Sequence, residues 1–302
     1  MSDLLWGIDL GGTKIEGVVF DGLPSETLCR LRVPTHSSEG YRCVLEQIAS
    51  LVSVMEQEVG HRAPVIGLGT PGALDPRTGQ LRNSNSTCLI GKPLKSDLEA
   101  LLGVPIRMAN DANCFALAEA SFGAAKGAST VFGVIMGTGV GGGIVVDGKV
   151  VGGVQGIAGE WGHNPLEPEG AKCYCGKMGC VETVLSGPAL EEFYFEQSGH
   201  RMGLRDIAVL AREGSDPHAV ATLSRLIDYF GKGLSVVVNI LDPEVIVLGG
   251  GVGNIDELYS LGVESLARNV FNNELLTHIR RPVLGDSAGV FGAAQLTVGH
   301  AG

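Results

Sequence analysis

Positive charge is scarce in this sequence. Its 302 residues include 22 Lys and Arg against 33 Asp and Glu, which gives a formal net charge of -11. Nucleic-acid binders neutralise phosphates with clustered Lys and Arg, so we expect no nucleic-acid partner. No run approaches the roughly 18 uninterrupted apolar residues of a spanning helix, and the start shows no basic stretch followed by an apolar one. These absences predict a cytoplasmic protein without a membrane partner.

Three familiar frameworks are absent as well. The seven cysteines are odd in number and unevenly spaced, which argues against the disulfide framework of a small secreted protein. No GxxxxGK[ST] sequence occurs, so there is no Walker P-loop. The segment GTGVGG at 137–142 matches GxGxxG, but the apolar residues IVV follow it where a dinucleotide-binding fold needs a helix.

Glycine, in contrast, is abundant and clustered. The chain has 46 glycines and 44% hydrophobic residues, enough for a sizeable core and about two domains. The glycines gather in short loops, where the missing Cβ lets the backbone approach a ligand closely. The sequence therefore indicates a folded protein whose loops contact a ligand.

One glycine-rich segment occurs twice. Residues 7–22, GIDLGGTKIEGVVFDG, align without gaps on residues 133–148, GVIMGTGVGGGIVVDG. Each copy reads as strand, glycine turn, strand and Asp-Gly turn. Helical periodicity and further apolar strands follow each copy, which predicts an α/β protein of two duplicated lobes. Chance similarity between glycine-rich hairpins is the alternative.

Three glycine turns are candidates for binding a nucleotide. In DLGGTK at 9–14, bare backbone N–H groups can approach phosphate oxygens while Asp9 holds a hydrated Mg²⁺; a simple tight hairpin is the alternative. The GTG at 137–139 likewise exposes backbone N–H groups that can approach phosphate oxygens. The glycines at 249–251 either leave room for adenine and ribose or form the turn between a strand and a helix. The candidate residues are Asp9, Gly11, Gly12, Thr13, Lys14, Gly137, Thr138, Gly139, Gly249, Gly250 and Gly251.

Asp111 lies at the junction between a short predicted strand and a predicted helix that opens at Asn110 or Asp111. Its carboxylate either caps that helix or, held on rigid backbone, acts as the general base for a sugar hydroxyl; the two roles are compatible. Glu160 and Glu182 stand at the two ends of a segment rich in metal-binding residue types. Their carboxylates are either acceptors for sugar hydroxyls or plain surface acids.

That segment predicts a zinc site. Its spacing is H-x9-C-x-C-x4-C, and the four residues are His163, Cys173, Cys175 and Cys180. Four nitrogen and sulfur ligands with no open position are typical of structural zinc; a redox pair or an accidental cluster is the alternative. A bound ion would hold the two ends of the segment, and with them the two glutamates, at a fixed separation.

Taken in order, seven motifs resemble those of the ROK (repressor, open reading frame, kinase) family of sugar kinases, in the actin-like ATPase and hexokinase superfamily: DLGGTK, GTPG, NDAN, GTGVGGGI, GEWGH, CYCGKMGCVE and VIVLGGG. The resemblance covers the whole chain. It implies two ribonuclease-H-like lobes with an interlobe active-site cleft, an N-terminal lobe at 1–118 and a C-terminal lobe at 119–287. A final helix at 288–302 is expected to pack back on the first lobe.

The resemblance also implies an activity and residue roles. ATP and Mg²⁺ would be cofactors, and a hexose would be phosphorylated on its 6-hydroxyl with Asp111 as general base. Asp9 would position Mg²⁺ near the phosphates. The sugar would be held by Gly72, Asn85, Asn110, Asp111, Glu160, His163 and Glu182, and Zn²⁺ by His163, Cys173, Cys175 and Cys180.

For the sugar, NSNST at 83–87 and GEWGHNPL at 159–166 look most like bacterial fructokinases. D-fructose is therefore the predicted substrate, with mannose or glucose tolerated; an N-acetylglucosamine kinase or a glucokinase of the same family is the alternative. From other classes, an idle sugar-binding protein and a sugar-responsive repressor compete. Such a repressor needs a helix-turn-helix domain, whereas here the phosphate hairpin starts within ten residues. Homodimers are common in the family, so a homodimer is compatible with the resemblance.

Overall fold

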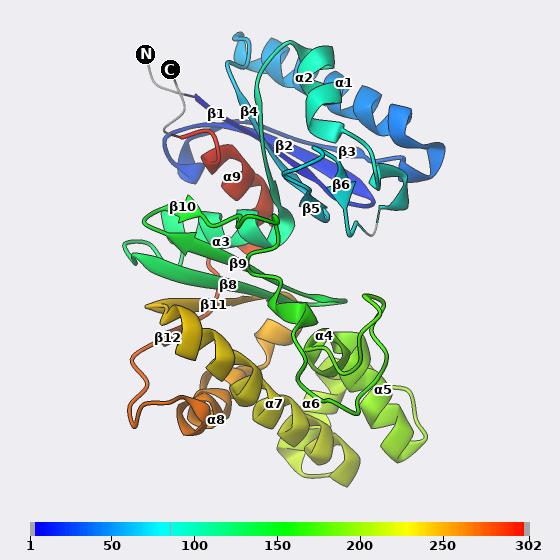
Figure 1. The fold of residues 1–302 in the computed structure, drawn as a ribbon, viewed down its shortest axis with the longest axis vertical. Coiled ribbons are helices and arrows are strands. Elements are labelled where there is room, and N and C mark those ends of the chain that lie inside the picture. Colours follow the sequence, from blue (N-terminus) through cyan, green and yellow to red (C-terminus); the bar gives the residue numbers. More distant parts are fainter. Residues whose placement is uncertain (1–3, 85, 299–302) are drawn as a thin grey trace. The chain divides into compact units, whose positions relative to one another are not determined.

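The structure, a computed structural model, describes residues 4–84 and 86–298 (Figure 1). Asn85, one of the predicted sugar contacts, lies outside the described residues. Contacts divide the chain into two compact units. Unit 1 comprises Met1–Gly127, Gly143–Ala158 and Val283–Gly302, and unit 2 comprises Ala128–Gly142 and Gly159–Pro282.

Unit 1 is built on a five-stranded sheet in the order β3-β2-β1-β4-β7. The strands are β1 (Leu4–Leu10), β2 (Lys14–Asp21), β3 (Thr27–Pro34), β4 (Ile66–Thr70) and β7 (Ile106–Asn110). The first three are antiparallel neighbours, whereas β1, β4 and β7 run parallel. A small hairpin follows β4, formed by β5 (Ala73–Leu74) and β6 (Leu81–Arg82). All residues of β4 are buried, as the apolar run predicts for a central parallel strand.

The helices of unit 1 are α1 (Tyr41–Val59), α2 (Leu94–Leu102), α3 (Asp111–Ser121) and α9 (Ala288–Gln295). Apolar residues at helical spacing along 41–59 form the buried face of α1, and Gly60 ends the helix in the left-handed conformation (φ 74°). From the other end of the chain, α9 packs on β1 and β4. A Cβ at Gly7 or Gly67 would collide with the α9 backbone, so these glycines permit the close approach.

The second sheet repeats this arrangement. Its order is β10-β9-β8-β11-β12, with β8 (Thr130–Met136), β9 (Val140–Val146), β10 (Lys149–Val150), β11 (Val245–Gly249) and β12 (His278–Arg280). The strand pair β8 and β9 corresponds to β1 and β2, and β11 runs parallel to β8 as β4 does to β1. The two aligned sequence segments thus form matching strand pairs, as predicted.

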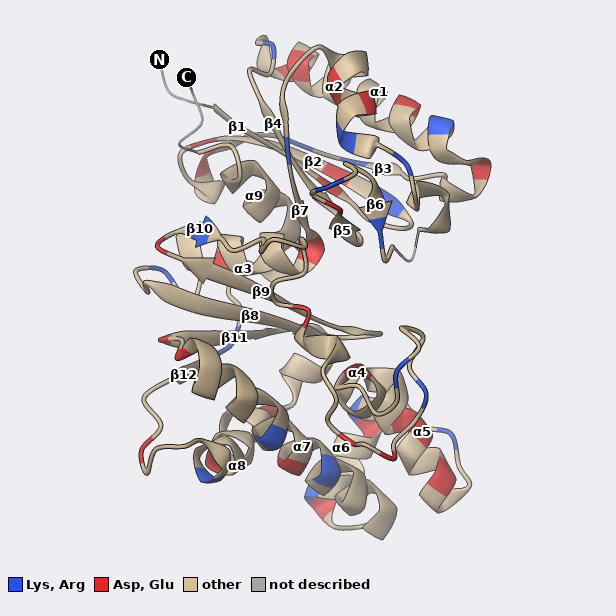
Figure 2. Cartoon of the chain, viewed as in Figure 1, with Lys and Arg blue, Asp and Glu red and all other residues tan. Residues whose placement is uncertain are grey.

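The helices of unit 2 are α4 (Glu182–Leu185), α5 (Gly187–Ser198), α6 (Leu204–Glu213), α7 (Pro217–Leu241) and α8 (Leu261–Asn269). Asp216 is the N-cap of α7, because its side chain accepts a hydrogen bond from the His218 amide at 2.8 Å. On the helices of each unit, Lys and Arg are interspersed with Asp and Glu (Figure 2). In the part of the chain that the structure describes, no helix combines the length and apolar character needed to cross a membrane.

Candidate functional site

Two carboxylates of unit 1 lie at the carboxyl ends of parallel strands. Asp9 is near the end of β1, in register with Gly69 of β4, and Asp111 directly follows β7. Burial raises the pKa of Asp9 to about 6, the negative charges of Asp111 and Glu16 add to the shift, and Lys14 opposes it. This end of a parallel sheet is where α/β proteins bind ligands.

Two glycines leave space for the Asp9 carboxylate. A Cβ at Gly289 would lie 3.0 Å from its Oδ2, and a Cβ at Gly69 would lie 3.4 Å from its Oδ1. Neither glycine belongs to the predicted site. Gly289 comes from α9, at the other end of the chain, so no local pattern could have connected it with Asp9.

The start of α3 separates the two roles considered for Asp111. Asn110 is the N-cap: its Oδ1 accepts a hydrogen bond from the Asn113 amide at 2.8 Å. The prediction that Asp111 caps the helix is therefore wrong, although its Oδ1 accepts the neighbouring Ala112 amide at 2.8 Å. The Asp111 side chain is accessible to solvent. Desolvation by the surrounding protein raises the pKa of its carboxyl, against the effect of that amide.

The turn between β1 and β2 carries the first candidate phosphate loop. The Gly11 amide donates to the Lys14 carbonyl at 2.9 Å, and the hydroxyls of Thr35 and Ser37 donate to the Gly11 and Gly12 carbonyls at 2.7 and 3.0 Å. Because the Gly11 and Gly12 carbonyls accept these hydrogen bonds, their positions are fixed within the protein. Gly12, Thr13 and Lys14 remain exposed. The turn is thus fixed while its tip stays accessible.

Ser86, which follows β6 in the sequence, lies beside this turn, because its hydroxyl would lie 3.6 Å from a Cβ at Gly12. Gly72 has a positive φ of 89°, and a Cβ there would collide with the Arg82 carbonyl. Only glycine suits that position, because its backbone is in the left-handed region and a side chain would have no space.

In unit 2, Glu182 contacts the glycine turn at 137–139. Its Oε2 accepts a hydrogen bond from the Val140 amide at 3.0 Å, and a Cβ at Gly139 would lie 2.6 Å from the same oxygen. The Gly187 amide donates to the Gly137 carbonyl at 2.9 Å. A predicted sugar contact and a predicted phosphate turn therefore lie together within this unit.

The third glycine cluster lies next to the same turn. Gly249 ends β11, in register with Ile135 of the parallel β8. Gly250 has a positive φ of 80°, and a Cβ there would collide with the Met136 carbonyl. The structure thus brings together two glycine clusters that are far apart in the sequence.

The four predicted zinc ligands converge. The ligand atoms of His163, Cys173, Cys175 and Cys180 all lie within 4.8 Å of one another. The Cys173 Sγ to His163 Nδ1 distance is 3.6 Å, as is the Cys175 Sγ to Cys180 Sγ distance. Zinc bonds of about 2.0–2.3 Å give a tetrahedron with edges of roughly 3.5–3.8 Å. The donor set and these two 3.6 Å distances therefore fit a tetrahedral zinc ion.

The two nitrogens of His163 face different groups. Nδ1 faces the cysteines, whereas Nε2 lies 3.0 Å from the Tyr174 hydroxyl, and the two rings meet edge to face at 5.2 Å. Partial burial of the hydroxyl raises the pKa of Tyr174 to about 12, and the charges of Glu182, Cys173 and Glu160 add to the shift. Tyr174 was not among the predicted site residues, although its place between two predicted zinc ligands marks it as near the metal.

The start of the segment is anchored in the core of unit 2. Glu160 precedes the short helix Trp161–His163. The Trp161 indole is buried, donates to the Gly233 carbonyl at 3.0 Å and packs edge to face on Phe132. This anchor fixes the backbone on which Glu160 and His163 stand.

A second anchor joins the zinc segment to α7. Glu167 forms a bidentate ion pair with Arg225, at 2.7 and 2.9 Å, and accepts the Tyr229 hydroxyl at 2.7 Å. Bidentate pairs of this kind fix orientation as well as distance. The segment is therefore attached to the rest of unit 2 at two points, Trp161 and Glu167.

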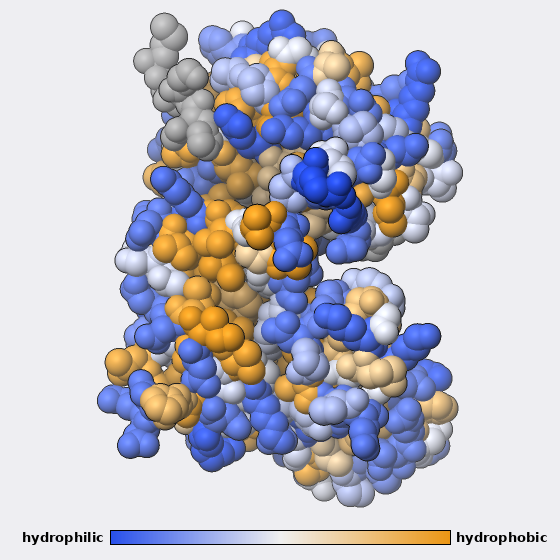
Figure 3. All heavy atoms as spheres, in the orientation of Figure 1, coloured by the Kyte–Doolittle hydropathy of each residue, from blue (hydrophilic) through white to orange (hydrophobic). Residues whose placement is uncertain are grey.

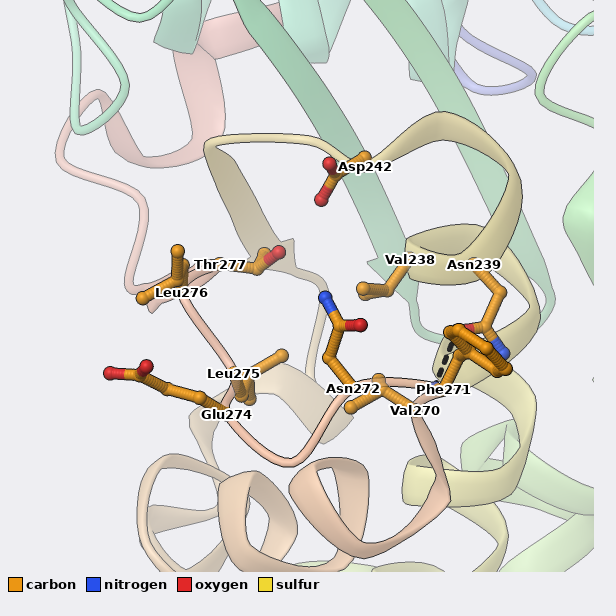
Figure 4. A pocket seen from close by; sticks show the side chains of 10 residues that line it. All are labelled: Val238, Asn239, Asp242, Val270, Phe271, Asn272, Glu274, Leu275, Leu276 and Thr277. Carbon is orange, nitrogen blue, oxygen red and sulfur yellow. Dashed lines mark hydrogen bonds between the residues drawn. The ribbon is translucent and has the colours of Figure 1, made fainter.

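A pocket of about 440 Å³ lies elsewhere in unit 2 (Figure 4). It is formed where α7 ends and by the chain between α8 and β12, and none of the predicted site residues lines it. Two lining residues, Phe271 and Leu276, are 92% and 75% exposed, and apolar side chains gather on the visible surface over the end of α7 (Figure 3). Most of the side chains that line this pocket are apolar or carry an amide group. They do not form a cluster of charged groups and glycine turns of the kind that phosphoryl transfer needs.

Comparisons with known proteins cover nearly the whole chain. A family model described as the ROK family matches residues 5–299. The chain is 36% identical over 305 residues to an N-acetyl-D-glucosamine kinase of Aliivibrio salmonicida (strain LFI1238), covering 98% of this chain and 100% of the relative.

Two of the solved structures that are similar to this one are kinases of the ROK family. The ROK hexokinase from Thermus thermophilus has 38% identity, a TM-score of 0.88 and coverage of 97% of each chain. A ROK family glucokinase from Streptomyces griseus, in complex with glucose and AMPPNP, has 30% identity, a TM-score of 0.77 and coverage of 97% of this chain and 98% of that one. The predicted α/β fold of the hexokinase type is confirmed.

Proposed function

We propose that this chain, a sugar kinase that belongs to the ROK family, transfers the terminal phosphoryl group of ATP to the 6-hydroxyl of N-acetyl-D-glucosamine. One observation carries the choice of sugar: the similarity to N-acetyl-D-glucosamine kinases extends over essentially the full length of both proteins. A local likeness at one loop would carry less weight.

The sequence motifs at 83–87 and 159–166 favoured D-fructose, and the named relatives support the N-acetylglucosamine alternative instead. The reason is physical. Discrimination between sugars depends on pocket contacts spread over the whole chain, and a methylene-sized difference at one contact is worth only about 1–3 kcal/mol. Two short motifs are therefore a weak guide to the substrate, and we replace fructose by N-acetyl-D-glucosamine.

Asp111 is proposed as the general base. It stands at the first position of α3, directly after β7, a strand hydrogen-bonded to β4 in the sheet, so its backbone is rigid. Its side chain is accessible, and its pKa is raised, both of which suit a group that takes a proton from a hydroxyl. As the sugar oxygen attacks the phosphorus atom, its proton would pass to this carboxylate.

The remaining predicted residues divide into two groups of proposed contacts. The sugar contacts are Gly72, Asn85, Asn110, Glu160, His163 and Glu182. The nucleotide contacts are Asp9, Gly11, Gly12, Thr13, Lys14, Gly137, Thr138, Gly139, Gly249, Gly250 and Gly251. Phosphoryl transfer depends mainly on positioning and charge neutralisation, which exposed glycine turns and a lysine suit. Mg²⁺, held near Asp9, would neutralise the phosphate charge that develops during transfer.

Zinc is proposed as a structural ion of the segment between Glu160 and Glu182. His163, Cys173, Cys175 and Cys180 would hold it, and a closed four-ligand site leaves no position for substrate. The residues between the two glutamates would then keep both carboxylates in place, together with the Trp161 anchor and the Val140 amide.

Glucose is the second candidate substrate, because the two similar structures are a hexokinase and a glucokinase. A coupled assay with ATP and Mg²⁺ should compare N-acetyl-D-glucosamine, glucose, mannose and fructose. We expect the highest kcat/KM with N-acetyl-D-glucosamine, by about 10-fold or more over glucose. A preference for glucose or fructose would overturn the substrate assignment, and the absence of ATP consumption with every sugar would contradict the mechanism.

A further inference from the structure

Arg225 of α7 forms an ion pair with the zinc segment, the residues between Glu160 and Glu182. Its two terminal nitrogens donate to the two carboxylate oxygens of Glu167, at 2.9 and 2.7 Å. Only 18% of the Arg225 side chain and 27% of the Glu167 side chain are exposed. Because a bidentate pair fixes orientation as well as distance, Glu167 is held in one orientation relative to α7.

Aromatic rings hold the guanidinium of Arg225 in place. It lies 4.8 Å from the ring centroid of Phe193 in α5 and 4.6 Å from that of Tyr229 in α7. The Tyr229 hydroxyl also donates to the Glu167 carboxylate, at 2.7 Å. A planar guanidinium that already lies against two rings loses little freedom when it binds a carboxylate. The group that the pair immobilises is therefore Glu167, in the zinc segment.

The backbone of Glu167 contacts the residue that precedes a proposed zinc ligand. The amides of Leu166 and Glu167 both donate to the Gly179 carbonyl, at 2.8 and 3.0 Å. Gly179 has a positive φ of 58°, and a Cβ there would collide with the Glu167 carbonyl. The two sides of the zinc segment are thus in direct backbone contact immediately before Cys180.

The contact between the two sides continues through Cys180. Pro165 and Cys180 form an antiparallel bridge, and the Val181 amide donates to the Asn164 carbonyl at 2.9 Å. A shift of one side of the segment against the other would move the Cys180 thiolate relative to the other three ligands. It would also displace Glu182, which follows directly after Val181.

We propose that Arg225 is a positioning residue for the zinc centre. By holding Glu167, it fixes the backbone that carries Cys180 at the distance that the other ligands require. Residues that orient the ligands of a metal commonly contribute about 10- to 100-fold to metal affinity. Arg225 thereby also supports the proposed sugar contact at Glu182. The inference rests on the proposed structural zinc, and it does not depend on which hexose is preferred.

The variant Arg225→Met tests this inference, because it removes the charge and keeps an unbranched side chain against Phe193 and Tyr229. Zinc affinity is measured on the whole protein by competition with a chelator, and circular dichroism checks that the variant is folded. We expect the Kd of zinc to rise about 10-fold or more. The Kd of the preferred sugar should rise about 3- to 10-fold, with kcat at saturating sugar and zinc within about twofold of wild type.

Arg212→Met is the matched control. Arg212 of α6 forms a bidentate pair of the same kind with Glu257, at 2.6 and 2.8 Å, and neither residue belongs to the zinc segment. Its zinc and sugar affinities should stay within about twofold of wild type. If Arg225→Met binds zinc as tightly as Arg212→Met does, the Arg225 pair only joins two parts of unit 2, and the inference is wrong.

Glu167→Gln removes the same ion pair from the side of the zinc segment, and it replaces Arg225→Met if that variant does not fold. We expect a similar loss of zinc affinity, and the double variant should bind zinc about as weakly as either single variant. Losses that multiply would show that Arg225 does not act through Glu167 and would contradict the inference. A wild-type protein that binds no zinc overturns the zinc site itself, whereas a zinc-binding wild type with an unaffected Arg225→Met overturns only this inference.

Discussion

The carboxylate of Glu119 accepts a hydrogen bond from the backbone amide of Leu284 at 3.1 Å. The same side chain accepts the Val283 amide at 3.1 Å and the Ala124 amide at 2.8 Å, and it is completely buried. One carboxylate in α3 thus binds two stretches of unit 1. One precedes Gly127, the end of the first stretch of unit 1, and the other begins at Val283, the start of its last stretch.

Glu119→Gln should destabilise the protein by about 2–4 kcal/mol. The amide side chain has one oxygen, so its NH2 group would face a backbone N–H and leave buried donors unpaired. Urea denaturation measures the change. Glu264→Gln, at an exposed position of α8, is the control, with an expected effect below about 0.5 kcal/mol. Equal midpoints for the two variants would show that the Glu119 contacts contribute nothing.

Asp111→Asn should abolish most turnover and spare sugar binding. Asparagine keeps an oxygen that can accept the Ala112 amide, but it cannot take a proton. We expect kcat to fall about 10²- to 10⁴-fold, with the Kd of the sugar within about twofold of wild type. Steady-state assays and calorimetry provide the two numbers. A kcat close to wild type would remove Asp111 from the role of base.

Asp9→Asn should stabilise the protein near neutral pH. The pKa of the Asp9 carboxyl is about 6 in the folded chain against an ordinary 3.8. The folded state therefore keeps a proton that the unfolded chain has released, and stability falls as pH rises between about 4 and 6. Removing the carboxyl should raise the free energy of unfolding by about 2 kcal/mol near pH 8, and by almost nothing near pH 4. Urea denaturation in magnesium-free buffer measures both; a gain independent of pH would exclude this cause.

Gly139→Ala should weaken sugar binding with little cost in stability. The new Cβ would lie 2.6 Å from Glu182 Oε2, and a flexible carboxylate can move away, losing the Val140 amide. We expect the Kd of the sugar, measured without nucleotide, to rise about 3- to 10-fold. Gly137→Ala is the control within the same turn, because nothing lies within 4 Å of its Cβ position. If both variants bind sugar equally well, Glu182 does not need its present position.

Cys175→Ser should lower zinc content and sugar affinity together. Loss of one thiolate removes one of the four zinc ligands. Changes around a metal site commonly lower metal affinity or activity by about 10- to 100-fold, and we expect losses of this size in zinc affinity and in sugar affinity. Zinc content is measured by elemental analysis and sugar binding by calorimetry. Cys43→Ser, a thiol in α1 outside the cluster, is the control. Full sugar affinity in a zinc-free protein would contradict the coupling between ion and sugar site.

Local pattern accounted for much of what the structure shows. The apolar face of α1, the Asp216 cap of α7 and the matching hairpins follow from spacing within a few residues. The zinc ligands are also close in sequence, so their convergence followed from short turns. At the start of α3 the pattern was less specific, because Asn110 and Asp111 are both good caps and only the backbone geometry distinguishes them.

The sequence by itself determined which residues can do chemistry: the glycine turns, the carboxylates after the strands and the four soft ligands. The tertiary structure alone decided which residues meet them. Gly289 borders Asp9, Leu284 binds Glu119, and the Tyr174 hydroxyl occupies the Nε2 side of His163. Periodicity and turn chemistry act over a few residues, whereas such contacts depend on how distant segments pack and on the rotamers that packing selects.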